Sequence, residues 1–225
     1  NSVQGSCDMG ALPNVLTGYR SVADDAVRAA FEAAWGVALP ATPGMTVPKM
    51  LEAIEADRLK ALFVFGENPM RSDPDIAHVE HCLRHVPFLV VQDIFLTETA
   101  RLADVVLPGA SFAEKDGTFA STERRVQRIR RAVAPVGDSR PDWEILADLL
   151  LRLGRPERYA SPEEVFDEMR RLTPSRAGTT YARLEAGGIQ WPCPDEAHPG
   201  TPILHVGGCA RGPGRFVALT HKEPA

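Results

Sequence analysis

Polar side chains that can bind a nucleotide follow three short apolar runs of the sequence. A carboxylate such as Asp93 can accept two parallel hydrogen bonds from the N1–H and the exocyclic amine of guanine, and amide side chains can serve its O6 and N7 or the ribose hydroxyls. These residue types therefore suit a guanine nucleotide. The side chains are Glu67, Asn68 and Ser72 after the first run, Gln92 and Asp93 after the second, and Glu114 and Lys115 after the third, which starts at Asp104.

Each of these residues also has a simpler structural interpretation. Asn68 precedes Pro69 and so favours a turn, Asp93 can be an ordinary residue at a strand end, and Asp142 is well placed as a helix N-cap. Neither the GxGxxG cradle of dinucleotide-binding domains nor the GxxxxGKS/T loop occurs in the chain. The residue types alone leave a nucleotide site and a purely structural role open.

The elements that must position these side chains predict an α/β fold. Short continuous apolar runs alternate with helical segments, which is typical of a buried, mostly parallel, doubly wound sheet. In such a sheet, ligands bind beyond the carboxyl ends of the strands, near the point where strand order reverses. The expected strands are 61–65, 88–91 and 104–107, and the helices between them are 74–85 and 97–102.

Four further helices are predicted by apolar residues at helical spacing, with Gly36 and Gly154 just beyond two of them. Segments 1–16 and 112–131 are expected to be irregular, the second as a structured loop. Beyond Gly187, Pro and Gly dominate, and only 203–205 and 216–219 look like strands. The four helices are expected at 24–35, 47–57, 142–153 and 161–172, the last with Pro162 at its first position.

Composition narrows the class of protein. A net charge of -5 with scattered Lys and Arg argues against binding of nucleic acid. The four cysteines never show the close spacing of zinc or iron–sulfur sites. No apolar run approaches the length of a membrane span and no secretion signal opens the chain, so we expect a cytoplasmic protein without direct membrane insertion. Because the chain starts at Asn1 and stops just after a strand-like segment, both ends look cut from a longer polypeptide.

Four stretches resemble the formate dehydrogenase branch of the molybdopterin oxidoreductase (DMSO reductase) family, in the order that the family has them. The resemblance covers essentially the whole chain, with weaker support from PDW at 141–143 and QWP at 190–192. The stretches are NSVQGSCDMG at 1–10, GENP at 66–69, VQDIFLTETA at 91–100 running into ADVVLP at 103–108, and AEKDGTF at 113–119 with TERRVQ at 122–127.

The resemblance implies a carboxy-terminal piece of such a catalytic subunit. Residues 1–186 would form its third domain, which binds the guanine dinucleotide part of a molybdopterin cofactor, and residues 187–225 would be a linker with the first strands of a cofactor-capping β-barrel domain. The nucleotide contacts carried over from the family are Asn68, Gln92, Asp93, Lys115 and Asp142, with Gly66, Glu67 and Ser72 lining the first loop. Lys115 would neutralise phosphate or anchor its loop, and its alternative is a surface salt bridge with Asp116 or Glu114.

The intact enzyme implied by the resemblance oxidises formate to CO2. It would use a bis-molybdopterin guanine dinucleotide with molybdenum or tungsten and pass two electrons to a 4Fe–4S cluster. The metal-ligating Cys or selenocysteine, the catalytic His and Arg, and the cluster cysteines would lie upstream of Asn1, so this chain has no catalytic or metal residue of that site. Gln4 and Asp8 are weaker candidates for facing the active site, and Ser121 is left out because the family shows Asn there.

Implied partners are the remaining domains of the same subunit and iron–sulfur and NAD- or quinone-linked electron-transfer subunits. An export signal upstream would make the protein periplasmic. Three alternatives stay open: a related molybdopterin nitrate reductase, a non-molybdenum scaffold like that of the complex I iron–sulfur subunit, and a stand-alone guanine nucleotide module. The VQDIF and DMG blocks favour formate dehydrogenase over the first, and the polar loops that bind the nucleotide disfavour the second. The absent phosphate cradle and the cut-looking ends disfavour the third.

Overall fold

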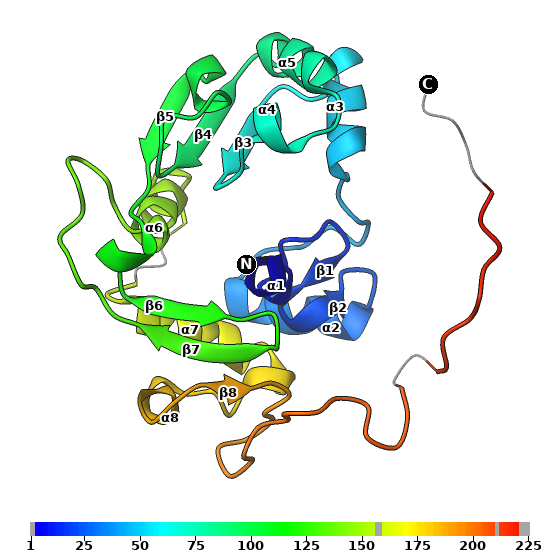
Figure 1. The fold of residues 1–225 in the computed structure, drawn as a ribbon, viewed down its shortest axis with the longest axis vertical. Coiled ribbons are helices and arrows are strands. Elements are labelled where there is room, and N and C mark those ends of the chain that lie inside the picture. Colours follow the sequence, from blue (N-terminus) through cyan, green and yellow to red (C-terminus); the bar gives the residue numbers. More distant parts are fainter. Residues whose placement is uncertain (1–2, 156–158, 210–211, 221–225) are drawn as a thin grey trace.

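The computed structural model describes residues 3–155, 159–209 and 212–220. Figure 1 shows a small parallel sheet at one end of the molecule and a small antiparallel sheet at the other, with helices around both. No helix in the described ranges is long and apolar enough to cross a membrane.

The parallel sheet confirms the predicted α/β class. Its strands lie in sequence order, and Val91 in the central strand is in register with Val64 on one side and Val106 on the other. The described residues therefore show no reversal of strand order, and the candidate site is defined by the strand ends alone. The strands are β3 (Leu62–Phe65), β4 (Leu89–Asp93) and β5 (Val105–Pro108), connected by α4 (Pro69–Ser72), α5 (Ile76–His85) and the 3-10 helix η2 (Ala100–Leu102).

Helices α3 (Val47–Glu55) and α5 pack against this sheet and enclose a hydrophobic core, referred to below as the first core. Val79, Leu89 and Val91 are essentially inaccessible to solvent, and burial of each such side chain stabilises the fold by about 1.5–3 kcal/mol. The core also contains Leu51, Ile54, Val64, Cys82, Leu83, Val86 and Ala100. This packing fixes where the strands end, and hence where the candidate site lies.

The predicted loop at 112–131 is wrong, because this segment forms most of the antiparallel sheet. Arg125 and Arg128 interrupt the alternation of apolar and polar residues that would have indicated a strand. In the structure, Arg125 donates to the backbone carbonyl of Gly188 and Arg128 donates to that of Gly117. Arg128 also lies 3.9 Å from the ring of Tyr181. The segment contains the 3-10 helix η3 (Phe112–Glu114), β6 (Gly117–Ala120) and β7 (Arg125–Ile129), and β8 (Ile189–Gln190) completes the sheet.

The expected irregular opening is also wrong, since Val3–Asp8 forms the helix α1. Its glycine allows close packing: a Cβ on Gly5 would already lie 3.7 Å from the Cβ of Ala120 in β6. The carboxylate of Asp8 then accepts from the indole of Trp191 at 3.0 Å and pairs with Arg176. Tertiary contacts thus override weak local propensity. The short elements that follow are β1 (Val15–Leu16), the 3-10 helix η1 (Thr17–Tyr19) and β2 (Arg20–Ser21).

The other predicted helices are confirmed with small shifts at their ends. Asp24 caps α2 by accepting from two backbone amides of the first turn, and Gly36 ends it in the left-handed conformation. Asp142, however, is the first helical residue of its helix rather than the N-cap, which is Pro141. Its carboxylate is directed to other side chains instead. The helices are α2 (Asp25–Trp35), α6 (Asp142–Arg152) and α7 (Pro162–Arg171), and the 3-10 helix η4 (Pro174–Arg176) and α8 (Tyr181–Glu185) were not predicted.

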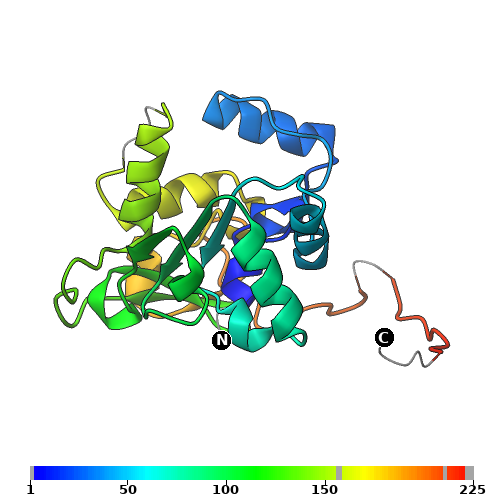
Figure 2. The same cartoon turned by 90° about the horizontal axis from the view of Figure 1, so that it is seen from above.

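The strands expected at 203–205 and 216–219 are wrong, because neither segment pairs with another strand. Ile203 and Phe216 are exposed, so apolar residues alone did not form a strand without a partner edge. This tail runs away from the sheets in both views (Figure 1, Figure 2). The boundary between residues 186 and 187, with a β-barrel domain beginning after it, stays a prediction; β8, just beyond it, pairs with β7.

The Asp8–Arg176 pair supplies a test of how α1 is held against η4 and the antiparallel sheet. Both side chains are almost fully buried. We expect Asp8→Asn to lower the free energy of unfolding by about 3–5 kcal/mol, because the charge of Arg176 would stay buried without its partner. Urea denaturation followed by circular dichroism measures this. Glu80→Gln, which breaks the exposed pair with Arg84, should cost less than about 1 kcal/mol. Equal losses in the two variants would contradict a special role of the buried pair.

Candidate nucleotide-binding site

Four segments of the chain meet at the carboxyl edge of the parallel sheet. The backbone N–H of Gly66 donates to the carbonyl of Gln92 at 2.8 Å, and that of Gly109 donates to the carbonyl of Asp93 at 3.0 Å. Gly109 also forms a parallel bridge with Arg140, two residues before α6. The start of α6 is therefore held at the same edge as the ends of β3, β4 and β5.

Three of the predicted site residues form one polar chain at this edge. Asp142 accepts from the side-chain amide of Gln92 at 2.9 Å through one carboxylate oxygen and pairs with the ammonium of Lys115 through the other. The partner of Lys115 is thus Asp142 and not Asp116 or Glu114. Gln92 is 1% exposed, and its carbonyl oxygen Oε1 has no hydrogen-bond partner among the described residues. A buried acceptor without a donor costs about 1–3 kcal/mol, so a ligand that donates there would remove that cost.

Gly109 makes this arrangement possible and was not predicted. A Cβ at this position would lie 3.0 Å from Oδ1 of Asp142, which is tighter than ordinary contacts. A side chain at position 109 would therefore displace the carboxylate that holds Gln92 and Lys115. The sequence signal was the Pro108-Gly109 pair that ends the third apolar run.

The first loop brings together Glu67, Asn68 and Ser72, as predicted, but these residues bond to one another and to the loop after β4. Asn68 donates to Glu98 at 2.8 Å and accepts from the hydroxyl of Thr99 at 2.7 Å, and the hydroxyl of Ser72 donates to Glu67 at 2.9 Å. The hydrogen bond from Asn68 holds the pKa of Glu98 below its usual range. Glu98 and Thr99 were missed because their partner lies some thirty residues away in the sequence.

Asp93 keeps one acceptor available at the end of β4. Its Oδ1 accepts from the backbone N–H groups of Ile94 and Phe95, at 2.7 and 3.3 Å, which fixes the turn after the strand. Its Oδ2 has no partner among the described residues. On the first strand, Gly66 turns the chain with a φ of 61°, and the space where a Cβ would project is open.

Glu114 holds the segment that carries Lys115. Its carboxylate accepts from the backbone N–H of Ser111 at 2.6 Å and from that of Val136 at 3.0 Å. These hydrogen bonds, the one from Ser111 first, hold the pKa of Glu114 below its usual range. Glu114 therefore positions the loop instead of facing a ligand.

Asp104, and the weaker candidates Gln4 and Asp8, lie away from the nucleotide-binding residues. Asp104 lies at the amino ends of the strands, where its carboxylate accepts from the backbone N–H of Leu89, the first residue of β4, at 2.7 Å. Gln4 and Asp8 bond to each other at 2.8 Å within the buried network of Arg176 and Trp191. The carboxylate of Asp8 thus connects α1 to η4 and to the residue that follows β8.

Comparisons with known proteins place these residues in a family. The profile described as molybdopterin oxidoreductase matches residues 1–152. The F420-dependent formate dehydrogenase 1 subunit alpha of Methanococcus maripaludis is 49% identical over 228 residues, covering 100% of this chain and 33% of the relative. The F420-dependent formate dehydrogenase subunit alpha of Methanocaldococcus jannaschii is 53% identical over 207 residues, covering 91% and 30%. This chain thus spans about a third of the length of these relatives.

A bacterial relative and a solved structure extend the comparison. The putative formate dehydrogenase YrhE of Bacillus subtilis is 47% identical over 185 residues, covering 82% of this chain and 19% of the relative. The structure of acetylene hydratase from Pelobacter acetylenicus is similar with a TM-score of 0.52 at 20% identity, covering 73% of this chain and 24% of that one. At this identity the structural likeness supports the fold alone.

The hydrogen bonds of Glu114 predict a dependence of stability on pH. Because its folded pKa is lowered, the stabilisation is complete above its unfolded pKa of about 4.3 and is lost as the pH falls through the folded pKa. We expect Glu114→Gln to be less stable than the wild type at pH 7, with the difference shrinking as the pH falls. Urea denaturation at several pH values measures it, with Glu52→Gln, an exposed carboxylate on α3, as the control. A difference that stays constant or grows in acid would contradict the assignment.

Proposed function

The chain belongs to the molybdopterin oxidoreductase family, and from that membership we propose that it binds the guanine nucleotide part of a molybdopterin guanine dinucleotide at the carboxyl edge of its parallel sheet. The observation that carries the proposal is the buried Oε1 of Gln92 at that edge, which has no hydrogen-bond partner among the residues that the structure describes. A guanine base and a ribose both offer N–H or O–H donors to such an acceptor.

The residues at the edge fit a guanine nucleotide. Oδ2 of Asp93 is an acceptor at the end of β4 for the N1–H and exocyclic amine of guanine, and Oε1 of the preceding residue, Gln92, is an acceptor for a separate donor of the nucleotide. Gly66 leaves open space at the neighbouring strand end. Lys115 is 18% exposed beside Asp142, so its ammonium can also interact with a phosphate while the carboxylate holds it in place.

The remaining predicted contacts support these groups. Glu67, Asn68 and Ser72 form a loop whose side chains are already hydrogen-bonded, and their direct contact with the nucleotide stays a prediction. When bound, the molybdopterin and its metal supply the two-electron chemistry, and this chain contributes orientation of the nucleotide tail. The residues named here therefore act by binding and positioning.

We further propose that the chain is part of the catalytic subunit of a cytoplasmic formate dehydrogenase that oxidises formate to CO2. The support is the high identity to subunits named formate dehydrogenase in archaea and in Bacillus subtilis. The catalytic and metal-ligating residues, a bis-molybdopterin guanine dinucleotide with molybdenum or tungsten, and the 4Fe–4S cluster would then belong to the complete subunit, with electron-transfer subunits as its partners.

Calorimetric titration with GDP, with ADP as the comparison ligand, tests the nucleotide site. We expect the chain to prefer GDP, and we expect Asp93→Asn to weaken GDP binding by about 1.5–3 kcal/mol, because an amide N–H would then face the guanine donors. Glu52→Gln removes an exposed carboxylate from α3 and should leave binding unchanged. Equal affinity for GDP and ADP in the folded chain, or full GDP binding by Asp93→Asn, would reject the site.

A further inference from the structure

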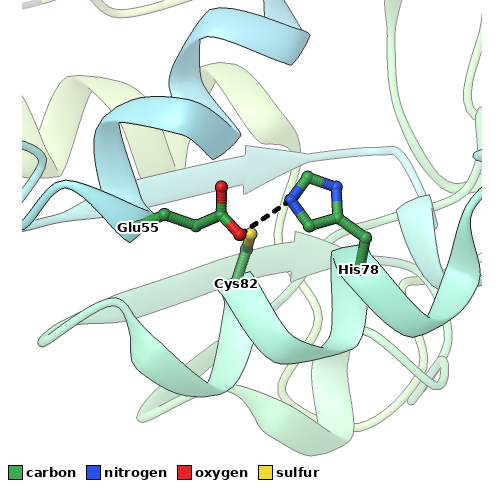
Figure 3. A group of neighbouring side chains, drawn as sticks. All are labelled: Glu55, His78 and Cys82. Carbon is green, nitrogen blue, oxygen red and sulfur yellow. Dashed lines mark ion pairs between the residues drawn. The ribbon is translucent and has the colours of Figure 1, made fainter.

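Three side chains with metal-binding atoms meet where α3 and α5 pack together, away from the nucleotide edge (Figure 3). Glu55 is the last residue of α3, and His78 and Cys82 lie one turn apart on α5. Nε2 of His78 is 3.1 Å from Oε1 of Glu55, and the ligand atoms of all three residues lie within 4.8 Å of one another. No other group of this kind occurs in the described ranges of the chain.

The helix geometry explains why these atoms converge. Residues four apart on a helix lie on the same face, so His78 and Cys82 both face α3. Cys82 is fully buried in the core, whereas the side chain of His78 is 36% exposed and that of Glu55 is 44% exposed. An ion can therefore enter from solvent past the carboxylate and the imidazole and reach the thiol behind them.

We propose that Glu55, His78 and Cys82 bind a divalent transition metal ion of the zinc class, with water as the fourth ligand. Thiolate sulfur, imidazole nitrogen and carboxylate oxygen are the ligands that Zn²⁺ prefers, while Mg²⁺ and Ca²⁺ require oxygen ligands. In a tetrahedral zinc site the ligand atoms are about 3.3–3.6 Å apart. The three atoms here need to approach by no more than about 1.5 Å, which changes of side-chain rotamer on Glu55 and His78 can supply.

A second pair of a histidine and a carboxylate, His85 and Asp57, also joins α5 to the end of α3 and provides a comparison without a cysteine. His85, two turns beyond His78 on α5, lies 3.4 Å from Asp57, just after α3. The ring of His85 stacks on that of His81 at 5.9 Å between centroids, and no cysteine sulfur belongs to this group among the described residues. The thiol of Cys82 is what distinguishes the first pair from the second, and the second pair serves as an internal control.

The state of the thiol adds a measurable consequence. Without a metal, the thiol of Cys82 donates to the backbone carbonyl of Leu51 at 3.9 Å. A bound divalent cation stabilises the thiolate, so the proton leaves to solvent as the metal–sulfur bond forms. The metal would then connect α3 to α5 beside the first core. The inference is independent of the proposed nucleotide site, because it uses none of its residues.

Titration of the full chain with Co²⁺ as a spectroscopic probe tests the site. Cys209 is exposed, so Cys209→Ser serves as the background for every protein. We expect one Co²⁺ per chain, a thiolate-to-cobalt charge-transfer band in the near ultraviolet, release of one proton, and displacement by Zn²⁺. His78→Ala and Cys82→Ala should lose the band and weaken Zn²⁺ binding by about 100-fold or more, whereas His85→Ala should bind as the background does.

Glu55→Gln is the second informative variant, because Glu55 is exposed and its replacement leaves the core intact. It should retain the fold, as circular dichroism reports, and bind Zn²⁺ at least about tenfold more weakly. The proposal is overturned if the folded background protein shows no charge-transfer band with Co²⁺. It is equally overturned if His85→Ala loses as much affinity as His78→Ala, since the metal would then be held by exposed imidazoles.

Discussion

The carboxylate of Asp142 joins the parallel sheet to the segment that leads into the antiparallel sheet of β6, β7 and β8. One oxygen accepts from Gln92 at the end of the central parallel strand, and the other pairs with Lys115, just before the antiparallel hairpin begins. Asp142 can do this because it lies in the first turn of α6, where the partial positive charge of the helix N-terminus also stabilises a carboxylate. Gly109 leaves the room that this carboxylate occupies. The positions of Gln92 and Lys115 at the carboxyl end of the sheet depend on this junction.

A second junction holds the opposite side of the fold together. Asp8 in α1, Arg176 in η4 and Trp191 after β8 meet through a buried ion pair, an indole hydrogen bond and a guanidinium that lies 5.0 Å from the indole ring. Burial lowers the pKa of Arg176 and Asp8 opposes this, so the guanidinium needs the carboxylate. Removal of water from two charges offsets much of their attraction. The pair therefore specifies which segments meet more than it adds to stability.

The sequence predicted those parts of the fold whose signal is local. The runs at 61–65 and 88–91 are apolar and followed by helical segments, so the parallel strands and the residues at their ends could be identified, including Gln92 and Asp93. β7 was missed because its arginines pack along their stems and ends against tyrosine and backbone, a pattern that looks like a charged loop in the sequence. Asp142 was identified as a site residue but given the role of a cap, because its partners lie 27 and 50 residues away. His78 and Cys82 have visible helical spacing, whereas Glu55 joins them only through helix packing.

The hydrogen bonds at the nucleotide edge divide its residues into two kinds. Glu67, Asn68 and Ser72 have their side-chain groups engaged with one another or with Glu98 and Thr99, so they form a loop that is fixed before any ligand arrives. Oε1 of Gln92 and Oδ2 of Asp93, by contrast, have no donors among the described residues, although the rest of each side chain is held. A few available acceptors on a rigid frame lose little entropy when a ligand binds, and their positions can select the donor pattern of guanine. In the proposed site, recognition would depend on these two oxygen atoms, and the hydrogen-bonded residues around them determine where the atoms lie.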